Sequence, residues 1–380
     1  MLNDISKQKW SFTITPVRLI LIAISLAGFA LIAYRLITGL GIVTNMNDEW
    51  PWGFWIAFDV MCGVALAGGG YATAFLIYVL RIDCLKPVAR GAMLTSLIGY
   101  LLVAVGLLLD VGQWFNFWRP FVSWGHSSVL FEVFLCITAY TVVQILEFGE
   151  IFTERVGKKY HNFFKKIMPA LIIIGIMIPT MHQASLGALY LMMDGKLYPL
   201  WWSPIIFLFF LMSSFFVGPA MVVVESSLAS KAFGHKIETG VLKKLVRIGG
   251  WVMLAYLVIK VCDLIARGKI GYLTDGNIES YLFIAEIVIG IIIPLIICFS
   301  RLANNRAWLA VFGVLTNLGL IFNRLNVVVT GMARNAGSLY LPAISEVIIS
   351  LSLVAIGALV YLFVCENFPV LGKETHKYAN

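Results

Sequence analysis

Long apolar segments alternate with short polar ones along almost the whole chain. Each apolar segment has about the 20 mostly apolar residues that an α-helix needs to cross a bilayer. The pattern predicts an all-α integral membrane protein with about ten transmembrane helices, arranged as two four-helix bundles plus flanking helices. The predicted spans cover residues 17–40, 53–80, 88–110, 128–149, 165–183, 202–225, 246–267, 280–300, 307–329 and 344–365.

A weak internal repeat predicts how these spans are grouped. The repeated residues are Asp110, Glu132 and His182 on spans 3 to 5, and Asp263, Glu286 and Arg324 on spans 7 to 9. Units of four helices repeat in parallel orientation, so we expect one bundle at about 53–183 and another at about 202–329. Both belong to a transmembrane domain at 17–366, between tails at 1–16 and 367–380.

Composition and charge fit a surface that faces lipid. Hydrophobic residues make up 60% of the chain and charged residues 13%, against roughly 25% charged residues in a soluble domain. The net charge of +8 does not indicate nucleic-acid binding, because the basic residues cluster in short segments between spans. Of the 28 lysines and arginines, 20 fall on the side that holds both termini and six on the other side. This asymmetry predicts that both termini are cytoplasmic.

Ionisable residues inside the predicted spans gather toward the outer side of the membrane. Charged groups there are costly and usually functional. In the first bundle the candidates are the acids Asp59, Asp110 and Glu132 and the imidazole of His182, with Gln113, Gln183 and Ser185 as polar companions. Acid, imidazole and amide groups suit a quinone headgroup, which needs hydrogen bonds and protons at its two oxygens. The alternative is a set of interhelical salt bridges and ordinary helix-end residues, together with an i,i+3 pair of Lys260 and Asp263 on one helix.

The fourth span carries a line of polar residues on one helix face. Cys136, Tyr140, Gln144 and Glu147 follow Glu132 at helical spacing, and Tyr100 on the third span could join them. The line is either a polar packing face between helices or a proton path toward the cytoplasm.

The cysteines and histidines do not predict a metal site. None of the six cysteines lies within four residues of another, so no iron–sulfur or zinc spacing is present. Of the five histidines only His182 is near the interior of a span, whereas a transmembrane haem needs paired axial ligands. We therefore expect no haem and no iron–sulfur cluster in this chain, and electrons would have to come from a partner.

Several motifs resemble one known family of membrane subunits. They are the segments 51–59 (PWGFWIAFD), 109–112 (LDVG), 128–132 (SVLFE), 179–187 (PTMHQASLG) and, more loosely, 323–326 (NRLN) and 342–346. Together they resemble the NrfD-like family, the membrane subunits of polysulfide reductase (PsrC) type complexes. Their order is most similar to the HybB-type membrane subunits of hydrogenase-2 [NiFe] hydrogenases.

The resemblance implies a haem-free subunit of the bacterial inner membrane that reacts with menaquinone or ubiquinone. Its quinone site would lie near the periplasmic surface, lined by Asp59, Glu132 and His182. A periplasmic ferredoxin-like iron–sulfur subunit would deliver electrons from the large and small [NiFe] hydrogenase subunits. One position departs from the family: relatives commonly have arginine where this chain has Gln113, and Arg119 is the candidate substitute.

Other functions remain open from the sequence. Another NrfD-type reductase complex, acting on polysulfide, nitrite or a related substrate, would share the same membrane subunit design. Repeated bundles with buried charges also fit a secondary transporter. A third possibility is a passive anchor without quinone chemistry.

Overall fold

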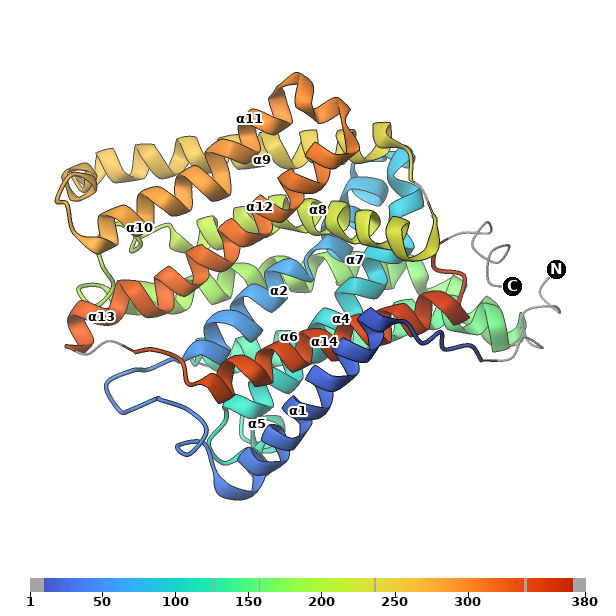
Figure 1. Cartoon of the computed structure of the whole chain (residues 1–380), viewed down its shortest axis with the longest axis horizontal. Coiled ribbons are helices and arrows are strands. Elements are labelled where there is room, and N and C mark those ends of the chain that lie inside the picture. The colour runs from blue at the N-terminus through green and yellow to red at the C-terminus, as the bar shows by residue number, and fades with distance from the viewer. Residues whose placement is uncertain (1–9, 126, 157, 236, 338–339, 372–380) are drawn as a thin grey trace.

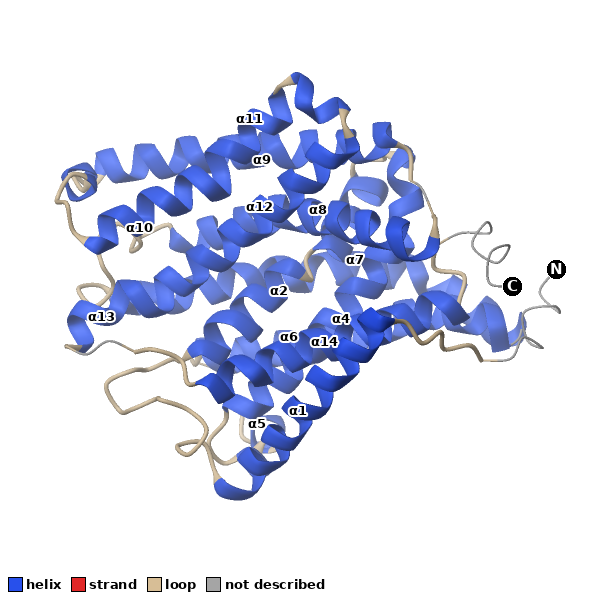
Figure 2. Cartoon of the chain, viewed as in Figure 1, coloured by secondary structure: helices blue, strands red, loops and turns tan. Residues whose placement is uncertain are grey.

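The computed structural model describes residues 10–125, 127–156, 158–235, 237–337 and 340–371. Within these ranges every regular element is a helix, and ten helical stretches are long and apolar enough to cross a membrane (Figure 2). The predicted class, an all-α integral membrane protein, is confirmed. Residues 1–9 and 372–380 of the predicted tails lie outside the described ranges.

The elements follow the predicted order along the chain (Figure 1). The spans are α1 (Pro16–Thr38); η2 (Ile56–Cys62), α2 (Gly63–Leu66), α3 (Gly69–Ala74) and η3 (Phe75–Val79); α4 (Lys86–Asp110); α6 (Val129–Val156); α7 (Lys158–Ala188); α8 (Ile206–Phe233); α9 (Thr239–Ala266); α10 (Ile278–Ile287), η8 (Val288–Ile292) and α11 (Ile293–Phe299); α12 (Arg306–Leu325), η10 (Asn326–Thr330) and α13 (Gly331–Ala336); and α14 (Ile344–Asn367). Short helices lie between them: η4 (Asp83–Leu85), η5 (Trp114–Asn116), α5 (Arg119–Val122), η6 (Leu189–Met193), η7 (Ile270–Leu273) and η9 (Arg301–Asn304).

Several helices are longer than the predicted spans. The fifth was predicted at 165–183, but α7 runs from Lys158 to Ala188 and passes Pro169 and Pro179 without interruption. Hydropathy detects only the part of a helix that lies in hydrocarbon, whereas backbone hydrogen bonds continue the helix into the polar interface. His182 consequently lies inside α7, six residues before its end.

Helix contacts fall mainly within two groups. The second span packs with α4 and α7, and α6 lies between α4 and α7; in the other group α8 contacts α9 and α12, and α11 contacts α9 and α12. The groups meet where α8 packs against α7 and the second span. Helices α1 and α14 pair with each other and flank the first group through α4 (Figure 1).

The two ends of the helix assembly differ. We call the end with both described chain termini the terminal face; there the amide of Ser11 donates to Oδ1 of Asn367, and Arg18 forms an ion pair of 2.6 Å with Glu366. We call the opposite end the loop face; it holds the connections after α1, α4, α7, α9 and α13. Hydrogen bonds join these connections: the side-chain amide of Asn45 donates to the carbonyl of Leu341, and that of Asn277 donates to the hydroxyl of Tyr198.

Two close backbone contacts hold the spans together. A Cβ built on Gly218 of α8 would come within 2.9 Å of the backbone of Gly68 in the second span. A Cβ on Gly319 of α12 would come within 2.2 Å of the Cα of Gly290 in η8. Small residues permit such approaches between membrane helices. The second span is also partly π-helical, and its first π segment carries Asp59.

Candidate functional site

Asp59 lies buried between three helices. Its carboxylate accepts a hydrogen bond of 2.6 Å from the hydroxyl of Ser350 on α14. Gly106 on α4 makes room for it, because a Cβ there would lie 2.9 Å from the Cβ of Asp59. The π-helical turn widens the helix at this point, and such turns are frequent at functional sites.

Glu132 is the second predicted acid, and it lies at the loop-face end of α6. The hydroxyl of Ser185 on α7 donates a hydrogen bond of 2.6 Å to its carboxylate. Glu132 is half-buried rather than sealed in the interior. The structure thus joins two residues that the sequence analysis had placed in the same candidate site.

His182 and Gln183 are neighbours on α7 and are completely buried. Both ring nitrogens of His182, and both the amide nitrogen and oxygen of Gln183, have no hydrogen-bond partner among the described residues. The hydroxyl of Tyr100, whose ring centroid lies 6.2 Å from that of His182, is also unpaired. Buried polar atoms are almost always paired, so these unpaired groups are candidates for hydrogen bonds to a ligand or to water.

Asp110 has its positive neighbour in an unexpected place. Arg35, in the last turn of α1, is fully buried and donates hydrogen bonds to the carbonyls of Leu109 (2.8 Å) and Val111 (2.6 Å). It interacts electrostatically with Asp110, one of whose carboxylate oxygens is buried and unpaired. Arg119 is exposed on α5, so it does not supply the charge that we expected from it.

Gln113 does not join the buried residues of the candidate site. Its side chain is exposed on the loop face and accepts a hydrogen bond from Asn116. This position therefore belongs to the surface of the loop after α4. The candidate site is formed instead by side chains that the spans themselves carry.

The polar face of α6 lines a water-accessible cavity of about 240 Å³. Tyr140, Gln144 and Glu147 contribute to its wall, but Cys136, one turn farther toward the loop face, does not. The exposed residue Lys86, at the start of α4, also lines it, so the cavity reaches the terminal face.

A chain of aromatic rings leads from this cavity toward His182. The ring centroids of Tyr140 and Tyr100 lie 4.5 Å apart, and that of His182 lies 6.2 Å beyond Tyr100. The side-chain amide of Gln144 donates to the hydroxyl of Ser96 on α4, which lies near the hydroxyl of Tyr140. Polar side chains thus extend from the terminal-face cavity to the unpaired groups of the first helix group.

The charged residues of the second helix group have protein partners instead. Glu286 accepts hydrogen bonds from the indole of Trp201 (3.0 Å) and from the amides of Asn323 (2.6 Å) and Asn326 (2.9 Å). Arg324 donates to Ser213 and to Oδ1 of Asn323, whereas its own Nε has no hydrogen-bond partner among the described residues. This network fixes helices against each other and leaves little capacity for a ligand.

Asp263 and Lys260 do not form the ion pair that their spacing suggested. Asp263 pairs with Arg267 at 2.7 Å and accepts a hydrogen bond of 2.9 Å from Ser203. The ammonium of Lys260 lies over the ring of Phe209, 4.5 Å from its centroid. An i,i+4 partner and an aromatic face thus replace the expected i,i+3 contact.

Partners from distant parts of the chain were missed by sequence reasoning. Ser350, Ser96, Trp201 and Ser213 are ordinary residues within or next to apolar segments, and nothing in their local pattern marks them. Asn323 and Asn326 did carry a signal, since both lie in the 323–326 motif.

Fold and site together define a polytopic membrane protein with unpaired hydrogen-bonding groups inside its first helix group. Residues 42–336 match the family described as Polysulphide reductase, NrfD. The chain therefore belongs to the NrfD family, and the predicted resemblance is confirmed.

Three relatives match over most of their length. A protein of Nitratidesulfovibrio vulgaris is 35% identical over 369 residues, which cover 94% of this chain and 95% of the relative. The Escherichia coli protein named Probable Ni/Fe-hydrogenase 2 b-type cytochrome subunit is 32% identical, with 90% of this chain and 88% of the relative covered. A second Nitratidesulfovibrio vulgaris protein, named Menaquinone reductase, integral membrane subunit, is 30% identical with the same coverage.

The name of the Escherichia coli relative calls it a b-type cytochrome subunit, and three histidines of this chain, His161, His182 and His235, lie in the described ranges. A haem within a bundle is held by axial ligands that reach it from facing helices. His182 is buried inside α7, and His161 lies far away along the same helix, with its Nδ1 3.3 Å from the carbonyl of Glu150. His161 and His182 lie 21 residues apart on one helix and so do not form an axial pair, and His235 lies half-buried just after α8.

Proposed function

We propose that this chain is the haem-free, quinone-interacting membrane subunit of a respiratory oxidoreductase, with menaquinone or ubiquinone as the substrate. The observation that carries the proposal is that the buried side chains of His182, Gln183 and Tyr100 have polar atoms without a hydrogen-bond partner among the described residues. A quinone carbonyl accepts hydrogen bonds, and an imidazole, an amide and a phenol can each donate one. The name of one relative, a menaquinone reductase subunit, agrees with this substrate class.

The acids of the first helix group would supply protons. Reduction of a quinone to a quinol takes two electrons from a partner subunit and adds one proton to each quinone oxygen. Asp59 and Glu132 each hold a serine hydroxyl at 2.6 Å and could pass protons onward through it. In this proposal His182 hydrogen-bonds one quinone oxygen and Gln183 helps to orient the ring.

The electron donor would dock on the loop face. That face exposes a cluster of large aromatic side chains on and around α5, namely Phe115, Phe117, Trp118, Phe121 and Trp124. Aromatic residues are enriched at protein interfaces, although they also mark the lipid boundary. We propose that a periplasmic ferredoxin-like iron–sulfur subunit binds there, and that the terminal face is cytoplasmic in a bacterial inner membrane.

The catalytic partner would be the pair of [NiFe] hydrogenase subunits, as the name of the Escherichia coli relative suggests. Metal analysis of the purified complex tests this choice. Nickel together with iron–sulfur clusters is the expected result. Molybdenum would redirect the proposal to another NrfD-type reductase, and a single metal-free chain would favour a transporter.

Replacement of His182 by alanine tests the quinone site. Hydrogen-dependent quinone reduction in membranes should fall at least tenfold, because one well-placed hydrogen bond contributes on the order of 1.4 kcal/mol or more. His161→Ala is the matched control, since that histidine lies near the terminal face on the same helix. Unchanged turnover in the His182 variant, with normal assembly, would remove this residue from the mechanism.

The cavity beside α6 would carry protons from the cytoplasmic side. Glu147 lies on its wall, and Tyr140 and Tyr100 lie between it and His182. Glu147→Gln should slow proton uptake into the quinone site while leaving assembly intact. Glu238→Gln, which changes an exposed acid on the terminal face of the other helix group, is the control. Equal proton uptake by vesicles with either variant would mean that the α6 face is only a packing surface.

A further inference from the structure

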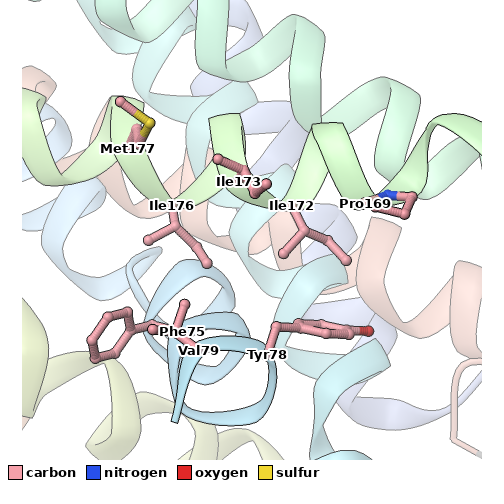
Figure 3. Close-up of a pocket in the computed structure, with 8 residues that line it drawn as sticks. All are labelled: Phe75, Tyr78, Val79, Pro169, Ile172, Ile173, Ile176 and Met177. Atoms are coloured by element: carbon pink, nitrogen blue, oxygen red, sulfur yellow. The ribbon is translucent and has the colours of Figure 1, made fainter. Parts of the chain in front are cut away.

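A second hollow lies beside the polar cavity and is apolar (Figure 3). It has a volume of about 320 Å³ and separates the middle of α7 from the terminal-face end of the second span. Its lining consists of Phe75, Tyr78, Val79, Pro169, Ile172, Ile173, Ile176 and Met177. Figure 3 shows Ile172 and Ile176 pointing across the gap toward Phe75 and Tyr78.

This groove opens sideways from the helix assembly. Tyr78 and Val79 on one wall, and Ile173 and Met177 on the other, are more than half exposed. Both walls belong to membrane spans, so the solvent at this opening is hydrocarbon. The lining offers one side-chain oxygen or nitrogen, the hydroxyl of Tyr78, which is too little to orient a polar ring. A flexible alkyl chain is the ligand that fits such a surface.

Basic residues stand where the groove approaches the terminal face. Lys165 and Lys166 are exposed on α7, one turn before Pro169. At 1.5 Å per residue, the two lysines therefore lie ~5 Å nearer the terminal face than Pro169 does. Arg81 is exposed two residues beyond Val79 on the opposite wall. Of the neighbouring acids, Asp83 is paired with Lys86 at 2.7 Å, and Glu147 and Glu150 line the polar cavity but not the groove. Three cations therefore lie at headgroup depth above an alkyl-sized groove.

We propose that this groove binds one anionic phospholipid. An acyl chain lies between Phe75 and Ile176, and the phosphate lies against Arg81, Lys165 and Lys166. Cationic side chains at headgroup depth attract anionic lipids, and apolar walls attract acyl chains. The combination selects an anionic phospholipid over a zwitterionic one and over the uncharged quinone.

The bound chain would also cover a thin part of the protein. Tyr78 and Ile172 line both this groove and the polar cavity beside α6. One layer of side chains therefore separates the polar cavity from the bilayer. An acyl chain held in the groove adds a second apolar layer over these side chains. Without it, the same side chains would face bilayer lipids that exchange freely.

Lipid retention by the intact complex tests the proposal. The complex is reconstituted in nanodiscs that contain phosphatidylglycerol and phosphatidylethanolamine, extracted with mild detergent and weighed by native mass spectrometry. We expect about one tightly held phosphatidylglycerol per chain. Retained phosphatidylethanolamine or quinone instead, or no retained lipid, would overturn the proposal.

Two variants test the two halves of the site separately. Ile172→Trp fills the groove and should abolish retention, whereas Ile289→Trp, on the lipid-facing surface of η8, should not. The pair Lys165→Gln and Lys166→Gln leaves the groove intact and should weaken retention about ten- to thirtyfold, the factor expected for two lost cationic contacts.

The matched control for the charge change is the pair Lys231→Gln and Lys244→Gln. These exposed lysines lie on the terminal face of the other helix group. Equal loss of lipid from both lysine pairs would show general attraction to an anionic surface and would refute a defined site. Full retention by the Lys165 and Lys166 variant would do the same.

Discussion

Replacement of His182 by leucine should separate stability from activity. The two side chains have similar volumes, and neither imidazole nitrogen has a hydrogen-bond partner among the described residues. The substitution therefore removes no protein hydrogen bond from a residue that is completely buried. Replacing an unpaired buried polar group by an apolar group of similar shape is neutral or stabilising, by up to about 3 kcal/mol.

Activity should change in the opposite direction. Leucine cannot donate a hydrogen bond to a quinone oxygen, so hydrogen-dependent quinone reduction should fall at least tenfold, as for alanine. Thermal unfolding of the purified complex in detergent measures the first effect, and quinone reduction in membranes measures the second. The informative result is the pair: equal or higher thermal stability together with lost turnover.

Glu286→Leu provides the contrast. Its carboxylate accepts three hydrogen bonds, from Trp201, Asn323 and Asn326. Side-chain hydrogen bonds between membrane helices contribute on average about 0.6 kcal/mol and at most about 1.7 kcal/mol each, so the loss should cost about 2 to 5 kcal/mol. The reasoning would be refuted if the His182 variant lost stability to a similar extent, because the imidazole would then be part of the packing.

Three further substitutions test the packing of the spans. Gly319→Val should prevent normal assembly, because a Cβ at this position would collide with the Cα of Gly290. The yield of folded protein after extraction measures this effect, and a normal yield would contradict the close approach. Arg18→Ala should lower the free energy of unfolding by about 1.5 to 3 kcal/mol, since it breaks a largely buried, bidentate ion pair with Glu366. An unchanged unfolding temperature would show that this ion pair does not stabilise the fold. Arg35→Leu removes two hydrogen bonds to the end of α4 and should loosen the loop that follows. Faster proteolysis or hydrogen exchange in that loop would detect the change, and unaltered protection would show that Arg35 does not hold the helix end in place.

Span number and the charge difference between the two faces follow directly from the sequence. A bilayer sorts residues along one dimension, so hydropathy summed over a window predicts a crossing without knowledge of the fold. Each of the ten candidate spans found in the described part of the chain was predicted in this way. Helix ends were less accurate, as α7 shows, because backbone hydrogen bonding continues beyond the hydrocarbon.

Helical periodicity correctly placed Tyr140, Gln144 and Glu147 on one face, because side chains four residues apart share a face of any helix. Periodicity does not predict which side chains or cavities that face contacts. At one end of it Glu132 bonds to Ser185, and nearer the terminal face the same helix borders a cavity.

Only the tertiary structure decided which charged groups are paired and which are free to act. Asp59 finds Ser350 on the last span, and Arg35 rather than Arg119 comes to lie beside Asp110. Such choices depend on how helices far apart in the chain cross and rotate, and single glycines such as Gly106 set those distances. The sequence placed ionisable residues in the membrane, but packing left His182 without a hydrogen-bond partner among the described residues and gave Glu286 three.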